Sequence, residues 1–210
     1  PVITAPSDFQ IEASHMENNV IDLIGIRVSD DVEITSITND APTVFPLGET
    51  IVTWTATDSS GNSSSDSQQI LVIDTTLPTI TPPLNVESEA TSMESNIVEF
   101  GFAEASDQVE ITSITNDAPT VFPLGETIVT WTATDSSGNS ASATQIINVV
   151  DTTSPVLIGP ENLIIEAEST LTEIENFGEI VAEDISEITS ITNDAPEVFP
   201  LGETIVTWTA

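Results

Sequence analysis

Acidic side chains carry nearly all the chemistry that this sequence could perform. The 210 residues include 35 aspartates and glutamates, but only one arginine, one histidine and no lysine, cysteine or tyrosine. Calcium takes about six to eight oxygen ligands, largely from carboxylates and carbonyls. The composition therefore favours a protein that binds divalent cations, and we predict Ca²⁺ as its cofactor. The alternative is a solvated acidic surface, as in proteins adapted to high salt.

Catalysis is poorly supported by the same inventory. His15 is the one imidazole that could act as a base, and the matched positions later in the chain hold Ser92 and Ser169. Paired carboxylates can hydrolyse glycosides, but near-copies of one small unit are typical of structural repeat proteins. We therefore predict that the chain is not an enzyme.

The net charge of −34 excludes two classes of partner. Nucleic acids and anionic membranes both attract basic patches, and this sequence offers only Arg27. No run approaches the roughly 18 apolar residues of a membrane helix, so we expect no direct membrane insertion in this segment. Mutual repulsion among so many carboxylates opposes a compact state, and divalent cations would relieve it.

A repeat of 77 residues organises the chain. The stretch ITSITNDAPTVFPLGETIVTWTATDSSGNS at 34–63 returns at 111–140 and begins again at 188. We predict three domains, called here the first, second and third copies: 1–77, 78–154 and 155–210. The third is incomplete and lacks the counterpart of the final hairpin and last strand. We expect the sequence to be a window on a longer array; the alternative is that another chain supplies the strand.

The periodicity of the apolar residues predicts strands. In TIVTWTATD, Val52, Trp54 and Ala56 share one face and the threonines between them share the other, which is the period of a half-buried strand. DSSGN fits a type I turn with Gly61 in the left-handed region, and ITSIT suggests a bulge. The strands expected in the first copy are 2–4, 8–13, 20–28, 32–38, 51–57 and 67–73, with a short one near 43–46. Such a series is typical of a β-sandwich.

These motifs resemble the hyalin repeat (HYR) domain family. The resemblance rests on the order DTTxP, EA, SD and FPLGETIVTWTATDSSGN, followed by a strand and Asp-Thr-Thr, and it covers all three copies. It implies an all-β fold of tandem immunoglobulin-like β-sandwich domains in an extended array. It also implies an extracellular or cell-surface protein that serves adhesion or matrix building.

Acidic loops are expected to converge where one copy meets the next. In an immunoglobulin-like topology the first copy brings Glu12 and Asp74 to this junction, and the second brings Asp107, Asp135 and Asn139. The arrangement resembles the junctional calcium sites of cadherins. Of these junctions, only that between the first and second copies has all its ligands within the sequence. With their counterparts in other copies, the predicted metal-binding residues are Glu12, Asp30, Asp58, Asn62, Asp74, Glu89, Asp107, Asp135, Asn139, Asp151 and Asp184.

Turn chemistry is the alternative explanation for these acidic residues. Aspartate is favoured as the first residue of a type I turn whatever else it does, which applies to Asp58. Asp74 could cap the turn into the two threonines that follow it. We assign Asp40 and Asp117, in the two NDAP segments, to structural turns. Asn62 begins an N-glycosylation sequon, but its counterpart at 139–141 is not a sequon, so we treat it as coincidence.

The sequence thus favours a non-enzymatic structural or adhesive protein, forming a calcium-stiffened rod or filament on or outside the cell. Its expected partners are neighbouring repeats or other copies of the same protein in a filament or surface layer. The alternative is an adhesin module that binds glycans or a surface protein through its loops, which the repeated loops and the 5% aromatic content disfavour. A third reading, accessory repeats beside a distant enzymatic domain, stays open.

Overall fold

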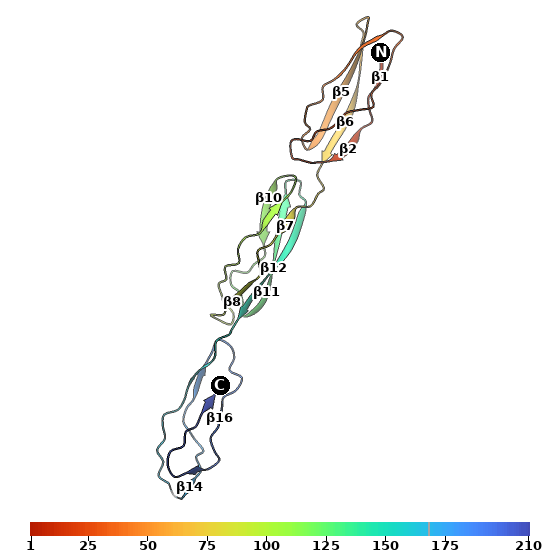
Figure 1. Cartoon of the computed structure of the whole chain (residues 1–210). Coiled ribbons are helices and arrows are strands. Elements are labelled where there is room, and N and C mark those ends of the chain that lie inside the picture. The colour runs from red at the N-terminus through yellow and green to blue at the C-terminus, as the bar shows by residue number, and fades with distance from the viewer. Residues whose placement is uncertain (168) are drawn as a thin grey trace. The chain divides into compact units, whose positions relative to one another are not determined.

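The computed structural model describes residues 1–167 and 169–210, and all of its regular elements are strands, β1 to β18 (Figure 1). The prediction of an all-β fold is therefore confirmed for the described residues. Within these ranges no helix is long and apolar enough to cross a membrane.

Contacts divide the chain into two compact units. The first comprises 1–83, 101–118 and 129–145, and the second comprises 84–100, 119–128 and 146–210. These units do not follow the 77-residue repeat, so the three domains 1–77, 78–154 and 155–210 stay a prediction.

The first copy lies within the first unit and forms two sheets. One has four strands in the order β2-β6-β5-β4, in which β2 runs parallel to β6 and the other neighbours are antiparallel (Figure 1). The other is the antiparallel pair β1-β3. The strands are β1 (Val2–Thr4), β2 (Phe9–Glu12), β3 (Arg27–Ser29), β4 (Ile34–Asn39), β5 (Gly48–Asp58) and β6 (Ser63–Ile73).

The apolar faces of these two sheets meet in one core. Alternate residues of β5 and β6 point inward, and Val52, Ile70 and Val72 are at most 1% exposed. Ile3 of β1 joins the same cluster from the other sheet. The Trp54 indole, 5% exposed, donates a hydrogen bond to Gln68 Oε1 at 3.4 Å, so the polar atom that comes with the large apolar ring is satisfied. The predicted sandwich is confirmed.

The rest of the first unit repeats this pattern. β7 (Thr79–Thr81) pairs with β9 (Glu104–Ser106), and β10 (Ile111–Asn116) pairs with β11 (Gly125–Asp135), which turns back into β12 (Ser140–Val150). The predicted bulge is present, because the register shifts between Ile34 and Ser36 and again between Ile111 and Ser113. Gly61 and its counterpart Gly138 have φ of +85° and +92°, as predicted for Gly61.

The second unit contains shorter strands. β8 (Val86–Glu89) runs parallel to the last residues of β12. Three further pairs follow: β13 (Val156–Ile158) with β15 (Val181–Glu183), β14 (Leu171–Thr172) with β17 (Phe199–Pro200), and β16 (Thr192–Asn193) with β18 (Trp208–Thr209). No described residue from 155 onward is fully buried, and Phe177, Phe199 and Trp208 line an open cavity of about 380 Å³.

Several of the predicted strands were wrong in extent. The apolar run 20–28 forms a strand only from Arg27, because Gly25 adopts φ of +98° and interrupts the extended backbone, and Ile24 is 81% exposed. The segment 43–46 makes a single bridge, Asn19 to Phe45. In contrast, β6 begins at Ser63, four residues before the predicted start, because the serines of its exposed face pair with β5.

Candidate functional site

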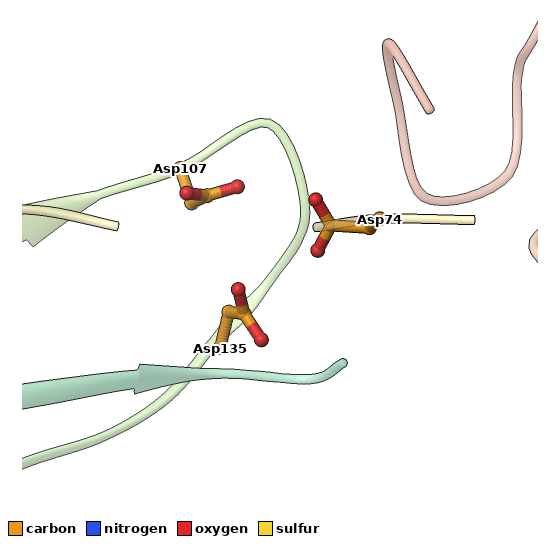
Figure 2. Close-up of side chains that lie close together, drawn as sticks. All are labelled: Asp74, Asp107 and Asp135. Atoms are coloured by element: carbon orange, nitrogen blue, oxygen red, sulfur yellow. The ribbon is translucent and has the colours of Figure 1, made fainter. Parts of the chain in front are cut away.

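Three carboxylates from separate segments come together in the first unit. Asp74 follows β6, Asp107 follows β9 and Asp135 is the last residue of β11. One carboxylate oxygen from each lies within 4.8 Å of the others. Figure 2 shows the three side chains pointing toward a common space. The structure thus brings these three predicted residues together.

The DSSGN turn holds Asp135 in place. Asp135 is 2% exposed, and its Oδ1 accepts hydrogen bonds from the backbone N–H groups of Ser137 at 2.8 Å and Asn139 at 2.9 Å. The Asn139 amide nitrogen donates to Oδ2 at 3.0 Å. Burial alone would raise the pKa of Asp135, but these hydrogen bonds outweigh it and the pKa lies below the ordinary value. The turn therefore favours a charged carboxylate in a buried position.

Asn139 also connects the turn to the segment that carries Asp74. Its Nδ2 lies 3.2 Å from both the backbone oxygen and Oδ2 of Asp74. Asp107 is fixed from its own loop, where its Oδ1 accepts from the backbone N–H groups of Gln108 at 2.6 Å and Val109 at 3.2 Å. Hydrogen bonds thus anchor Asp107 through one oxygen and Asp74 and Asp135 through both, while one oxygen of each approaches the other two.

This geometry fits a divalent cation. Two ligands of Ca²⁺ at about 2.4 Å can be at most about 4.8 Å apart, which is the limit within which the three oxygens lie. Without a cation, two unit charges at this separation repel by about 3–4 kcal/mol at an effective dielectric constant near 20. No ion pair relieves that repulsion in the described part of the chain. A half-turn of the Asn139 amide would replace its nitrogen by an oxygen ligand.

The first copy contains the same turn around Asp58, but the residues near that turn differ from those near Asp135. Asp58 is 4% exposed and accepts hydrogen bonds from Ser60 N, Asn62 N and Asn62 Nδ2 at 2.8–2.9 Å. The Asn62 side chain is the main reason that the pKa of Asp58 is lowered. Asp30, the counterpart of Asp107, accepts from Val32 N at 3.1 Å and lies 2.5 Å from the amino group of Pro1. The residue matched to Asp74 would precede Pro1, outside this sequence, so the described residues include no partner of that kind for Asn62.

Glu12 and Glu89 contact the connectors that follow β6 and β12. Glu12 Oε1 accepts from Thr75 N at 2.7 Å, Thr76 N at 3.1 Å and Thr76 Oγ1 at 2.9 Å, while Oε2 accepts from Thr75 Oγ1 at 3.0 Å. These hydrogen bonds, led by that from Thr75 N, lower the pKa of Glu12. Glu89 accepts from Thr152 N at 2.9 Å and Thr152 Oγ1 at 2.8 Å. Glu12 was predicted to join Asp74 at a cation, but its carboxylate is directed to the two threonines.

Asp151 and Asp184, the counterparts of Asp74 and Asp107, lie in the second unit. The Asp151 carboxylate accepts hydrogen bonds from the backbone and hydroxyl of Ser186 and from Thr153. The Ser186 hydroxyl is the largest cause of its lowered pKa. Asp184 accepts from the N–H of Ile185 at 2.6 Å. The register places the counterpart of Asp135 at 212, outside this sequence.

The threonines of the Asp-Thr-Thr connectors contact acidic residues of the predicted site, although they are not among the predicted residues. Thr75 and Thr76 were read as part of a connector, yet they bind the Glu12 carboxylate with both backbone and hydroxyl donors. The sequence contains a pattern that could have indicated this contact, because Asp-Thr-Thr recurs at 151–153 together with a glutamate at the position matched to Glu12. These hydrogen bonds hold the connector to which Asp74 belongs, and so help to fix the position of its carboxylate.

Comparisons with known proteins agree with the repeated motifs. Residues 73–149 match the family model described as the HYR domain. The whole chain is 38% identical to Hyalin from Strongylocentrotus purpuratus and, over 99% of its length, 33% identical to Hyalin from Lytechinus variegatus. The chain spans 19% and 43% of the lengths of these two relatives.

Similarities of smaller extent also occur. A rat protein named Sushi, von Willebrand factor type A, EGF and pentraxin domain-containing protein 1 is 39% identical over 47% of this chain, which is 3% of its own length. Among solved structures, protocadherin gammaB7 EC3-6 aligns with 92% of this chain and 58% of its own, at 15% identity and a TM-score of 0.38. Drosophila N-cadherin EC1-4 aligns with 70% and 48% respectively, at 15% identity and a TM-score of 0.34.

Proposed function

Because this chain belongs to the hyalin repeat family, we propose that it is a non-enzymatic structural or adhesive protein that acts outside the cell or on its surface. In this proposal the chain is part of a tandem array, and Ca²⁺ stiffens the array into a rod or filament. Neighbouring repeats and other copies of the chain are its partners. The named relatives are called Hyalin, and the chain spans less than half of either.

The convergence of Asp74, Asp107 and Asp135 carries the cation part of the proposal. Asp74 belongs to the connector that leaves β6, whereas Asp107 and Asp135 belong to loops of the second copy. An ion bound by all three would tie the connector to those loops and would remove their mutual repulsion. Ca²⁺ suits this donor set, because it accepts carboxylate, carbonyl and amide oxygens in a flexible geometry, whereas Mg²⁺ demands a near-ideal octahedron.

Three features support a structural rather than a catalytic role. The DSSGN turn and its buried aspartate are repeated in the first and second copies with the same hydrogen bonds. The carboxylates are anchored to backbone N–H groups, which fixes their positions. The acidic surface itself repels other copies of the chain, and bound divalent cations would weaken this repulsion.

Thermal unfolding of the whole chain tests the cation role. Ca²⁺ should raise the Tm, because a ligand that binds only the folded state stabilises it by about 2.7 kcal/mol at 100 times its Kd. Asp135→Asn should lose most of the rise, and Asp58→Asn, the same change in the same turn of the first copy, should keep it. No rise at millimolar Ca²⁺, or equal losses in both variants, would contradict the proposal.

A further inference from the structure

Part of the outer face of the four-stranded sheet of the first copy carries rows of hydroxyl groups, bordered by the acidic residues Asp40 and Glu49. Thr53, Thr55 and Thr57 on β5 alternate with buried residues, and Ser63, Ser65 and Ser67 lie beside them on β6. Ser36 and Thr38 of β4 extend the rows on the other side, opposite Thr57 and Thr55. These eight residues are defined here as the hydroxyl face.

The second copy repeats this face with the same register. Thr132 and Thr134 of β11 contact Ser142 and Ser140 of β12 through their hydroxyls at 2.9 Å, as Thr55 and Thr57 contact Ser65 and Ser63 at 3.0 and 2.9 Å. The hydroxyls therefore stand in regular rows, spaced about 4.8 Å across strands and about 6.8 Å along them.

An exposed isoleucine extends each face. Ile51 precedes Thr53 on the same side of β5 and is 61% exposed, and its counterparts Ile128 and Ile205 are 59% and 81% exposed. A β-branched apolar side chain in this position loses water-exposed area only if another surface covers it. Glu49, two residues before Ile51, is the first acidic residue along this side of β5.

We propose that the hydroxyl face, together with Ile51, is the surface through which two copies of this chain associate side by side. Each chain has a net charge of −34, so contact through acidic surfaces would oppose like charges. The eight residues of the hydroxyl face carry no charge themselves, and hydroxyls both donate and accept, so a contact confined to these residues is complementary to itself. The proposal deepens the structural role proposed above, and it does not require the cation site.

Each face should bind weakly by itself. It presents about ten side chains, whereas stable interfaces use roughly 20–30 residues on each side. The 77-residue repeat presents the same face again in the second copy. Two chains that engage several faces at once would gain affinity through effective concentration rather than through new contacts. Association is therefore expected to strengthen with the number of copies.

Sedimentation of the whole chain in EDTA tests the surface without divalent cations. The wild type should show a dimer fraction that rises with protein concentration. The double variant Thr55→Asp/Thr132→Asp places like charges in the contact and should weaken association by about tenfold or more. The matched control Thr43→Asp/Thr120→Asp adds the same charge at exposed positions off the face and should have little effect.

A second measurement covers the case in which the aspartate variant does not fold. The chain contains no cysteine, so a single Thr55→Cys substitution reports disulfide trapping between copies, with Thr43→Cys as control. Faster trapping at position 55 is expected. A wild type that stays monomeric at about millimolar concentration, or equal trapping at both positions, would overturn the inference. Because calcium is absent, failure here leaves the calcium-dependent rise in Tm separately testable.

Discussion

The turns Asp58–Asn62 and Asp135–Asn139 have the same sequence, DSSGN, but different neighbours. In both, the aspartate is buried and accepts hydrogen bonds from the backbone and side chain of the asparagine. Only at Asn139 does the amide nitrogen also reach Asp74. The shared part is therefore a self-contained turn, and at Asn139 the connector that precedes the second copy adds a further contact.

This difference separates turn chemistry from cation chemistry. If the aspartates served only the turn, substitutions at the two positions would have equal effects under all conditions. If Asp135 is also a ligand, Asp135→Asn should reduce the stability gained from Ca²⁺ more than Asp58→Asn does. Without Ca²⁺, Asp135→Asn should instead lower the stability less than Asp58→Asn does. The two turns are thus matched controls for each other within one chain.

The turn glycines should give the largest effects. Gly138 and Gly61 have positive φ, and a Cβ at either position would meet no atom within 4 Å. Replacement by alanine should therefore cost only the backbone penalty, about 1–2 kcal/mol, at both sites. Gly138→Ala should in addition weaken Ca²⁺ binding, and Gly61→Ala should not. Urea unfolding and calcium titration of the two variants measure this pair of effects.

Neutralising one aspartate in EDTA should give the next largest effect, a difference in Tm between Asp58→Asn and Asp135→Asn. Asp58→Asn and Asp135→Asn both weaken the hydrogen bonds of the turn, but Asp135→Asn also relieves repulsion from Asp74 and Asp107, whose ligand oxygens lie within 4.8 Å. We expect Asp135→Asn to lower the Tm by less than Asp58→Asn does. Calorimetry without divalent cations checks the order, and the reverse order would contradict the clustering of charge.

Acid should erase the contribution of the buried carboxylates. The folded-state pKa values of Asp58 and Asp135 lie below the ordinary value, so their stabilising effect is fully present above the unfolded pKa of about 3.9. It is lost as pH falls through the lower, folded pKa. The stability difference between the wild type and Asp58→Asn should hold at neutral pH and shrink below about pH 4. A difference that does not change down to pH 2 would contradict this assignment.

The connector glutamate should give the smallest effect. Glu12→Gln removes one of the two oxygens that accept hydrogen bonds from Thr75 and Thr76. We expect a slight loss of Ca²⁺ affinity with little change in Tm, because Glu12 is exposed but holds the segment next to Asp74. Glu89→Gln, the same change in the second copy, should leave the affinity unchanged. Calorimetric titration with calcium compares the two variants.

Local patterns in the sequence predicted much of this fold. The alternation in TIVTWTATD predicted the inward face of β5, and the bulge in ITSIT and the left-handed Gly61 followed from spacing and turn chemistry. The repeat also led to the prediction that Asp74, Asp107 and Asp135 converge, because the topology expected for one copy could be applied to the next copy.

Other features depend on contacts that no local pattern reveals. The apolar run 20–28 reads as a strand, but Gly25 turns the backbone and leaves Ile24 exposed. Glu12 was assigned to the cation cluster by its place at a strand end, whereas the hydroxyls of Thr75 and Thr76 compete for its carboxylate. Hydrogen-bond competition of this kind depends on distances of a few tenths of an ångström, which sequence spacing does not determine.

A crystal structure of the whole chain grown with CaCl₂ would show whether Asp74, Asp107 and Asp135 bind the ion. We predict one anomalous peak bound by oxygens of these three residues, with at least about six oxygens at 2.3–2.6 Å. We also predict that the Asn139 amide presents its oxygen to the ion. An ordered cluster that holds only water at millimolar Ca²⁺, with Asn139 Nδ2 still donating to Asp74, would contradict both predictions.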